Sequence, residues 1–528
     1  FATLAAGGNA FDAAIAVAAA LAVVEPYSSG LGGGGFWLLQ RGRDAHPVML
    51  DGRERAPLAA RRDMYLDPAG APVPRLSVDG PLAAGIPGVP AALAHLAEHY
   101  GRLALAQTLE PAIALARDGF ALDAVYGDMA RFRLDALRRS PAAAAQFLQA
   151  GNVPSEGTLL RQPDLAETLE RLALEGRDGF YAGAFAGRLV AGVRAAGGIW
   201  SLKDLREYRV VERAPVRGEY RGRRIVSASL PSSGGVVLLQ MLNMLSGYDL
   251  ESLDAPTRSH LLVEVMRRAY RDRAAFLGDP DFVEVPVRRL LHPFYASGLA
   301  RDIDLARATA GPRMPLLDAA EAADTTHYSI LDQEGNRVAA TLSINYPFGS
   351  AFVPPRTGVL LNDEMDDFAM RPGVANLYGL TGGAANAIAP GKRMLSSMTP
   401  TSEDWDAGVA ILGTPGRSRL ITMVLSAVLA VIEGKHPEEW AGMARFHHQY
   451  LPNEIQHEPA AFTPAQRDAL KAMGHRLRVV PPERFGNMQV VFWDKLHGRV
   501  LAASDPRGVG AAAVRPAPRR AEPNNAPR

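Results

Sequence analysis

The chain has 528 residues, a formal net charge of +1 at pH 7 and 21% charged residues. This near balance provides no extended basic or acidic field, so nucleic acid is not expected as a partner. There is no cysteine, which excludes disulfides, a thiol nucleophile and cysteine-ligated zinc and leaves the redox compartment open. A chain of this length can form several domains or one large layered unit.

The first predicted element is a helix over residues 13–24, where every side chain is apolar. A helix needs roughly 20 residues to span a bilayer, so we expect a buried helix here and no membrane-spanning segment. The sequence opens on Phe1 inside what looks like a helix already under way. We therefore expect the natural N-terminus, with any export signal, to lie outside this sequence.

A glycine-rich run follows at Gly30 to Gly35 and matches the pattern G-x-G-x-x-G. A dinucleotide-binding oxidoreductase would need a strand before these glycines and a helix after them. The order here is the reverse, because a strand-like run begins at Phe36. Close backbone packing or a tight turn is therefore the favoured interpretation. The sequence has neither a Walker A motif nor a G-x-S-x-G nucleophile elbow.

Hydrophobic periodicity gives a mixed architecture. Helices are predicted at 90–100, 105–118, 163–174 and 258–275, and strands at 36–40, 48–51, 220–228, 326–332, 337–345, 408–413 and 488–493. Because the strands are scattered over both halves, the sheets should combine segments from both sides of residue 325. Residues 308–324 show little pattern and are predicted to form a flexible linker. A helix at 418–432 follows the turn at 413–416, which would place backbone amides at its N-terminus.

Two adjacent threonines, Thr325 and Thr326, stand at the start of the run 326–332. Turn-forming residues join this run to the next, so the two runs are predicted to form a hairpin. If it folds about Glu334, Ser343 lies opposite Thr325, close enough for the two hydroxyls to share a hydrogen bond. Asn345 would then point to the same face. A register shifted by one residue would turn these side chains to the other face.

Thr325 is a candidate nucleophile. A threonine hydroxyl needs a base near neutral pH, and cleavage of the chain just before Thr325 would free an α-amino group with a reference pKa of about 7.7–8.0. On this segment alone, ordinary β-propensity is the simpler explanation for two threonines at a strand start.

The segment Thr-Thr-His-Tyr-Ser at 325–329 resembles the autoprocessing site of γ-glutamyltransferases, which are N-terminal-nucleophile hydrolases. Other similar segments run in family order along nearly the whole chain, among them GNAFDAAIAV at 8–17, LGGGGF at 31–36, DGRERAP at 51–57, PSSGG at 231–235, LLNDEMDDF at 360–368, RPGVANLYGL at 371–380 and KRMLSSMTPT at 392–401. The resemblance implies an α/β (α+β) fold, a four-layer αββα sandwich built from both processed chains.

The same resemblance implies cleavage into a large subunit, 1–324, and a small catalytic subunit, 325–514. Residues 515–528 are rich in proline and arginine and are expected to be a disordered tail. The implied substrates are glutathione and related γ-glutamyl compounds. The implied acceptors are water, amino acids and peptides. No cofactor is implied, and the family suggests a periplasmic or secreted location.

Family positions also imply substrate-binding residues. Two carboxylates and an amide suit an α-ammonium group, and the matching residues are Asn345, Glu364 and Asp367. The α-carboxylate would be held by Arg53, Ser396 and Ser397, and Tyr378 would lie in a lid loop over the pocket. Without the resemblance, the acidic run at 363–367 would be interpreted as a solvated turn, and Arg53 beside Glu54 as a surface ion pair.

The implied catalytic residues are Thr325 and Ser343, with the backbone amides of Gly416 and Arg417 forming the oxyanion hole. Three positions depart from the common family pattern. Ser343 replaces a threonine, Glu364 replaces a glutamine found in many bacterial members, and Arg417 replaces the second of two glycines. If position 417 requires a positive φ, the strain would be about 1–2 kcal/mol.

A metal site is not expected. The pair His447-His448 has no spaced histidine or carboxylate partner in the sequence. Two alternatives to a γ-glutamyltransferase stay open. One is an amidohydrolase of the cephalosporin or glutaryl acylase kind, against which the lid segment argues. The other is a γ-glutamyl-binding homologue with impaired turnover, which Arg417 makes worth testing.

Overall fold

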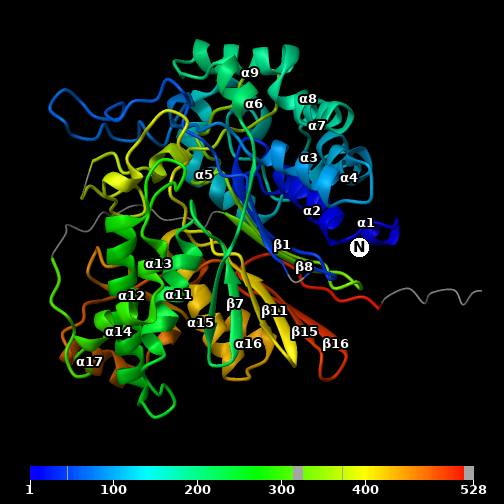
Figure 1. Ribbon diagram of the computed structural model, residues 1–528. Coiled ribbons are helices and arrows are strands. Elements are labelled where there is room, and N and C mark those ends of the chain that lie inside the picture. The colour runs from blue at the N-terminus through cyan, green and yellow to red at the C-terminus, as the bar shows by residue number, and fades with distance from the viewer. Residues whose placement is uncertain (45, 313–324, 372, 517–528) are drawn as a thin grey trace, which may run out of the picture.

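The computed structural model describes residues 1–44, 46–312, 325–371 and 373–516. Two antiparallel sheets pack face to face between layers of helices (Figure 1). Predictions that fall on residues 313–324 of the linker or on 517–528 of the tail lie outside the described residues.

The strands are β1 (Gly34–Gln40), β2 (Val48–Asp51), β3 (Phe120–Ala121), β4 (Leu159–Leu160), β5 (Val211–Arg213), β6 (Val216–Tyr220), β7 (Arg223–Ser227), β8 (Thr326–Leu331), β9 (Arg337–Ser343), β10 (Thr401–Trp405), β11 (Gly408–Gly413), β12 (Phe446–His447), β13 (Ile455–His457), β14 (Leu477–Val479), β15 (Gln489–Asp494) and β16 (Arg499–Ser504).

The α-helices are α1 (Ala2–Ala5), α2 (Ala10–Val24), α3 (Val89–His99), α4 (Leu105–Asp118), α5 (Ala124–Arg139), α6 (Pro141–Phe147), α7 (Pro163–Glu175), α8 (Asp178–Tyr181), α9 (Gly183–Ala195), α10 (Leu202–Glu207), α11 (Gly234–Leu245), α12 (Ala255–Phe276), α13 (Val287–Leu290), α14 (Pro293–Arg301), α15 (Leu420–Ile432), α16 (Pro437–Gly442) and α17 (Pro464–Ala472). Short 3-10 turns are η1 (Pro81–Ala83), η2 (Glu364–Asp367), η3 (Ala384–Asn386), η4 (Arg417–Arg419), η5 (Pro459–Ala461) and η6 (Pro482–Arg484).

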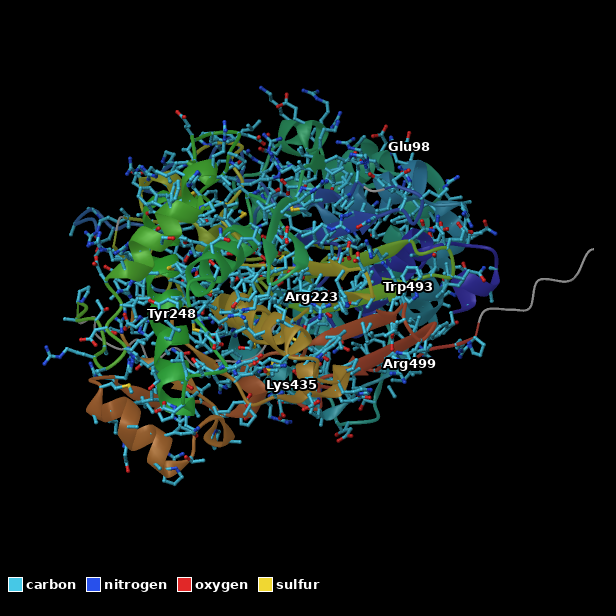
Figure 2. All side chains as sticks on the ribbon, turned by 60° about the horizontal axis from the view of Figure 1, so that its bottom comes forward. Glu98, Arg223, Tyr248, Lys435, Trp493 and Arg499 are labelled. Atoms are coloured by element: carbon cyan, nitrogen blue, oxygen red, sulfur yellow. The ribbon has the colours of Figure 1, made fainter. Side chains whose placement is uncertain are left out.

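The first sheet has the order β5-β2-β1-β9-β8, and the second has the order β16-β15-β11-β10-β7-β6. The first sheet joins strands from before and after residue 325, as the scattered strand pattern predicted. In the second sheet, Trp493 and Arg499 lie near the end of the β15–β16 hairpin (Figure 2). Shorter sheets are formed by β12-β13-β14 and by β3-β4.

Side chains alternate between the two faces of each strand, and this places the core in three layers. Between the sheets, Leu38 of β1 and Ala339 of β9 pack against Val226 and Ile411 of the second sheet. The outer face of the first sheet is covered by helices including α2, α3, α4 and α7. Helices α11, α12, α15 and α16 cover the second sheet. The predicted four-layer αββα sandwich is confirmed.

The glycine run is used for close packing, as predicted. A Cβ at Gly33 would lie 2.1 Å from the carbonyl oxygen of Ser343, and one at Gly35 would lie 2.4 Å from that of Thr341. Only glycine allows β1 to approach the chain around β9 this closely. The dinucleotide interpretation finds no support, because the run leads from a helix into a strand.

Two strand predictions need correction. The run 220–228 is not one strand, because β6 and β7 form a hairpin that turns at Arg221 and Gly222, both with positive φ (48° and 74°). The run 337–345 ends early at Ser343. Helices predicted at 105–118 and 163–174 match α4 and α7 closely. Within the described residues, no helix is both long and apolar enough to cross a membrane.

Candidate active site

The β8–β9 hairpin sets the candidate nucleophile against a second hydroxyl. Thr326 pairs with Leu342, so Thr325 stands opposite Ser343, and their hydroxyl oxygens lie 3.0 Å apart. This confirms the hairpin about Glu334 and its register. Both residues are buried. Thr325 has a φ of +85°, a conformation that is rare for a β-branched residue and costs strain.

Asn345 reaches this site by a turn, which corrects the expectation that strand alternation would place it there. Its φ is +76°, and its backbone N–H donates to Oγ of Ser343 at 2.8 Å. Its side-chain amide donates to the carbonyl oxygen of Asp363 at 3.0 Å. Asp363 in turn accepts from the backbone N–H of Tyr346 at 2.8 Å. The turn therefore fixes the backbone N–H of Asn345 against the hydroxyl of Ser343 and its side-chain amide against Asp363.

Arg53 lies at the centre of a buried charged cluster. Its guanidinium is 2.7 Å from Glu364, 2.5 Å from Asp367 and 3.5 Å from Glu54. Arg53, Glu54 and Glu364 are buried, so neither the surface ion pair nor the solvated turn describes them. Residues predicted to bind the opposite ends of an amino acid are in contact with one another.

This cluster has more carboxylates than cations. Burial raises the pKa of Glu54 to about 7, although Arg53 opposes the change. Burial also raises the pKa of Glu364, again against the effect of Arg53. Burial alone would lower the pKa of Arg53, but Glu364, Glu54 and Asp367 raise it overall. Among the described residues, the carboxylate oxygens of Glu54 have no hydrogen-bond partner, and Arg53 at 3.5 Å is their ion-pair partner.

The charged cluster adjoins the hydroxyl pair through β1. Gly34 pairs with Ser343 across the strands. A Cβ on Gly34 would lie 2.5 Å from Oε2 of Glu54. Glu54 follows Arg53 directly in the chain, and Glu364 follows the Asp363 that holds Asn345. The predicted nucleophile and the predicted amino-acid clamp thus share one site.

Ser396 and Ser397 follow Met394, whose carbonyl oxygen accepts from Nε of Arg53 at 3.3 Å, and the sequence did not reveal the partners of the two serines. Ser397 Oγ accepts from the guanidinium of Arg273 at 3.0 Å. Arg273 also donates to Ser233 at 2.9 Å, and Ser233 donates to the carbonyl oxygen of Ser396 at 2.6 Å. Ser233 belongs to the segment PSSGG, which signalled the family but was given no role. Arg273 lies inside α12, where its sequence offered no sign of a site.

In the turn after β11, Arg417 adopts the positive φ that the family's glycine at this position would favour. Gly416 has a φ of +135° and Arg417 a φ of +62°. The turn continues into η4 and then α15, with the N–H of Arg419 donating to the carbonyl oxygen of Gly416 at 3.0 Å. Position 417 therefore does adopt the conformation in which an arginine is strained relative to glycine.

Tyr378 lies beside this region. Its ring is 6.4 Å from that of Tyr346, the residue after Asn345. Neighbouring residues of this loop contact the acidic run: the side-chain amide of Asn376 lies 3.3 Å from Asp367, and the N–H of Leu377 donates to Asp366 at 3.0 Å. The loop that the sequence singled out thus contacts the predicted substrate-binding residues.

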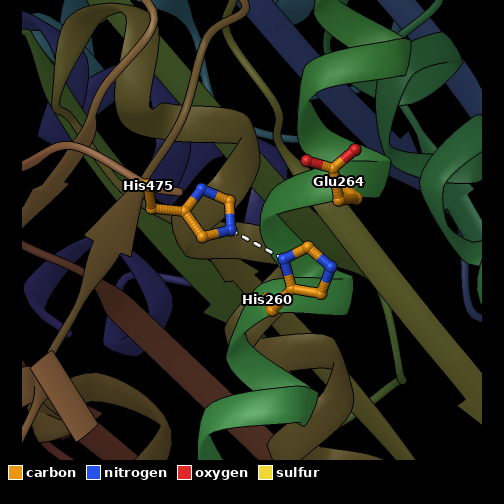
Figure 3. Close-up of side chains that lie close together, drawn as sticks. All are labelled: His260, Glu264 and His475. Atoms are coloured by element: carbon orange, nitrogen blue, oxygen red, sulfur yellow. Dashed lines mark hydrogen bonds between the residues drawn. The ribbon is translucent and has the colours of Figure 1, made fainter. Parts of the chain in front are cut away.

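The adjacent histidines His447 and His448 both form side-chain hydrogen bonds. His447 contacts Thr422 and Gln449, each at 2.9 Å. A second group, His260, Glu264 and His475 (Figure 3), was not predicted from the sequence. Its two facing ring nitrogens are 2.7 Å apart, closer than the roughly 3.3 Å expected for two ligands of a tetrahedral zinc ion.

The carboxylate of Glu264 in that group already has several ion-pair and hydrogen-bond partners. It pairs with Arg267 and Arg268, at 3.2 and 2.5 Å, and accepts two hydrogen bonds from Thr309. These partners lower its pKa to about 2 despite burial. The group therefore fits a hydrogen-bond network that anchors the segment around Thr309 better than a metal site.

A four-layer αββα sandwich with a threonine hydroxyl at the start of a strand, here β8, is the arrangement of N-terminal-nucleophile hydrolases, and this chain is an enzyme of that class. Within the class it belongs to the gamma-glutamyltranspeptidase family, whose model matches residues 2–515.

Individual relatives agree with this assignment. A glutathione hydrolase proenzyme from Escherichia coli (strain K12) is 40% identical over 510 residues, which are 95% of this chain and 87% of that protein. A cephalosporin acylase from Bacillus halodurans superposes with a TM-score of 0.83 at 27% identity, over 97% of this chain and 92% of that one. Helicobacter pylori gamma-glutamyltranspeptidase superposes with a TM-score of 0.56 at 40% identity, over 57% of this chain and 87% of that one.

Proposed function

We propose that this enzyme is an autoprocessed γ-glutamyltransferase and glutathione hydrolase. It would cleave γ-glutamyl amides through an ester on Thr325 and pass the acyl group to water, an amino acid or a peptide. The observation that supports this most directly is the buried group of Arg53, Glu54, Glu364 and Asp367 beside the Thr325–Ser343 hydroxyl pair. A guanidinium next to several carboxylates is complementary to a zwitterionic α-amino acid.

Autoprocessing would occur at the bond between residues 324 and 325. The hydroxyl oxygen of Thr325 attacks the carbonyl carbon of residue 324, and the peptide nitrogen leaves as the α-amino group of Thr325. Water then hydrolyses the resulting ester and frees the hydroxyl. The strained φ of Thr325 favours this step, because cleavage releases the strain. The cut would separate the large subunit, 1–324, from the small catalytic subunit, 325–514, which carries the tail 515–528.

In the processed enzyme, the α-amino group of Thr325 would take the hydroxyl proton as the oxygen attacks the γ-carbonyl carbon of the substrate. The backbone N–H groups of Gly416 and Arg417 would stabilise the tetrahedral oxyanion. Removing one such donor typically costs about 2.7–4 kcal/mol of barrier. The ammonium then returns the proton to the leaving amine, and the acyl group remains as an ester on Thr325. Water or an acceptor amine attacks this ester with the same base.

When the substrate binds, ion pairs within the Arg53 cluster would be replaced by ion pairs with the substrate. The α-carboxylate of the γ-glutamyl group would take the guanidinium of Arg53, supported by Ser396 and Ser397. The α-ammonium would bind Glu364 and Asp367, with Asn345 beside them. In this exchange the substrate ammonium takes the place of the Arg53 guanidinium beside Glu364 and Asp367, so the charge of these carboxylates stays compensated.

An acylase acting on glutaryl amides is the second candidate, and the high TM-score to a cephalosporin acylase favours it. A glutaryl group has the carboxylate but no α-ammonium, so it would leave Glu364 and Asp367 without a new cationic partner. The higher identity to glutathione hydrolases and the lid around Tyr378 favour γ-glutamyl substrates. A periplasmic or secreted location would accompany this function.

The test is to express the protein and follow it by denaturing electrophoresis, with N-terminal sequencing of the smaller fragment. We expect a fragment that begins at Thr325, hydrolysis of a γ-glutamyl anilide and little hydrolysis of the matched glutaryl anilide. Thr325→Ala should stay uncut and inactive. Activity in uncut wild-type protein would overturn the proposal, and a preference for the glutaryl anilide would favour the acylase. A cut protein that binds glutamate but turns over neither anilide would identify a binding homologue.

A further inference from the structure

The side chain of Arg417 connects the turn after β11 to the lid. Its guanidinium carbon lies 4.7 Å from the ring centroid of Tyr378 and 5.3 Å from that of Tyr346. The residue is 7% exposed, so the guanidinium is held against both rings and away from bulk solvent. A cation over two aromatic rings in a desolvated place is a favourable contact, and the planar guanidinium suits it better than an ammonium.

The two rings belong to segments that act on different parts of the site. Tyr346 follows Asn345, whose N–H is bonded to Ser343. Tyr378 belongs to the lid loop, and its carbonyl oxygen accepts from Gln449 at 3.1 Å. Arg417 itself stands in the turn proposed to bind the oxyanion. One side chain thus joins the lid, the oxyanion turn and the segment that supports the nucleophile.

We propose that Arg417 is a positioning residue that latches the lid loop through Tyr378 against Tyr346. This inference rests on the proposed function for its catalytic consequence, but the latch itself is a property of the folded chain. A glycine at this position would relax the backbone at φ +62° and would remove the contact with both rings. The backbone strain is therefore accompanied by a link that a tandem glycine cannot make.

The chain contains a matched control. Arg75 also has a positive φ, of 61°, and its guanidinium carbon lies 5.7 Å from the ring centroid of Tyr346. Arg75 is paired with Asp79 and lies outside the proposed catalytic and binding residues. Replacing it tests the loss of a strained arginine near Tyr346 without removing the Arg417–Tyr378 contact.

The experiment is hydrogen–deuterium exchange of the processed enzyme, read on peptides that cover 374–381. We expect Arg417→Gly and Arg417→Met to speed amide exchange there at least tenfold, whereas Arg75→Met leaves it within twofold of wild type. Methionine retains a Cβ and an apolar stem, so it separates loss of the cation from relief of backbone strain. Unchanged exchange in Arg417→Met would overturn the latch.

Lid variants provide a second test if the Arg417 variants fold poorly. Tyr378→Phe keeps the ring, and we expect wild-type amide exchange over 374–381 in this variant. Tyr378→Leu removes the ring and should raise both the exchange rate and KM, with a smaller change in kcat. Equal behaviour of the two variants would contradict the latch. Because exchange needs no turnover, a protein with the expected exchange pattern but no γ-glutamyl activity would support the latch and overturn only the proposed function.

Discussion

The hydroxyl of Ser343 lies 3.0 Å from the hydroxyl of Thr325 and accepts a hydrogen bond from the backbone N–H of Asn345 at 2.8 Å. Either hydroxyl can donate across the Thr325–Ser343 contact, and Ser343 would be the donor once the oxygen of Thr325 begins to lose its proton. In the proposed mechanism this contact orients the attacking oxygen and stabilises it as it loses its proton.

Removing the hydroxyl of Ser343 should therefore slow both reactions of Thr325. For Ser343→Ala we expect autoprocessing and kcat for a γ-glutamyl anilide to fall by roughly tenfold to a hundredfold, in line with the loss of one charge-assisted hydrogen bond. Time courses on denaturing gels and steady-state kinetics measure the two effects. Ser343→Thr keeps the hydroxyl and should stay near wild type. Wild-type rates in Ser343→Ala would remove the serine from the mechanism.

Replacing Arg53 with another cation, lysine, should impair substrate turnover. Its guanidinium contacts Glu364 and Asp367 through different nitrogens, and a lysine ammonium cannot reproduce this fork. We expect Arg53→Lys to lower kcat/KM for a γ-glutamyl anilide by more than about tenfold, mainly through KM. Autoprocessing serves as the control, because the Arg53→Lys variant should still be cleaved before Thr325. A kcat/KM equal to wild type would exclude Arg53 from substrate binding.

Sequence reasoning reached the hairpin and its register because strand alternation and a turn centred on Glu334 leave few alternatives. It reached the substrate-binding residues of the charged cluster through family resemblance alone. Arg53 and Asp367 are 314 positions apart, and no local pattern connects them. The buried contact of Ser397 with Arg273 was missed for the same reason, since an arginine inside α12 has the pattern of an ordinary helix residue.

The strand β10 was missed for a different reason. Its sequence, Thr401–Trp405, contains Glu403 and Asp404, and charged residues are unusual in the middle of a sheet. The fold accommodates Asp404 by pairing it with Arg337 of β9 at 2.8 Å. That partner comes from the other sheet, so the ion pair becomes visible only when the two sheets are packed together.

Glycine at position 33 should be required for folding around the nucleophile. A Cβ there would lie 2.1 Å from the carbonyl oxygen of Ser343, whereas one at Gly30 would have no neighbour closer than 3.7 Å. We expect Gly33→Ala to reduce the yield of folded, processed protein sharply and to lower Tm by several degrees, since the backbone of Ser343 must move. Gly30→Ala is the matched control and should remain close to wild type. Equal thermal unfolding curves for the two variants would contradict the close packing.

His327 should make the protein less stable in mild acid. It is buried, with ring nitrogens 2.9 Å from Thr341 Oγ1 and 3.2 Å from Ser329 Oγ, and burial lowers its pKa from 6.5 to about 3. Between these values the unfolded chain binds a proton that the folded protein does not. The free energy of unfolding therefore decreases as pH falls below about 6.5. For one such group the loss between pH 7 and pH 5 is about 2 kcal/mol.

His327→Gln removes this titration and keeps a polar side chain that can bond to Thr341. We expect it to lose about 2 kcal/mol less than wild type between pH 7 and pH 5, whatever its stability at pH 7. Urea unfolding at the two pH values, followed by circular dichroism, gives this difference. His475, whose pKa burial lowers to about 4, contributes in the same direction and is unchanged in the variant, so it cancels in the comparison. The same pH dependence in both proteins would show that His327 becomes protonated in the folded state, which its burial against Gly413 and Thr341 opposes.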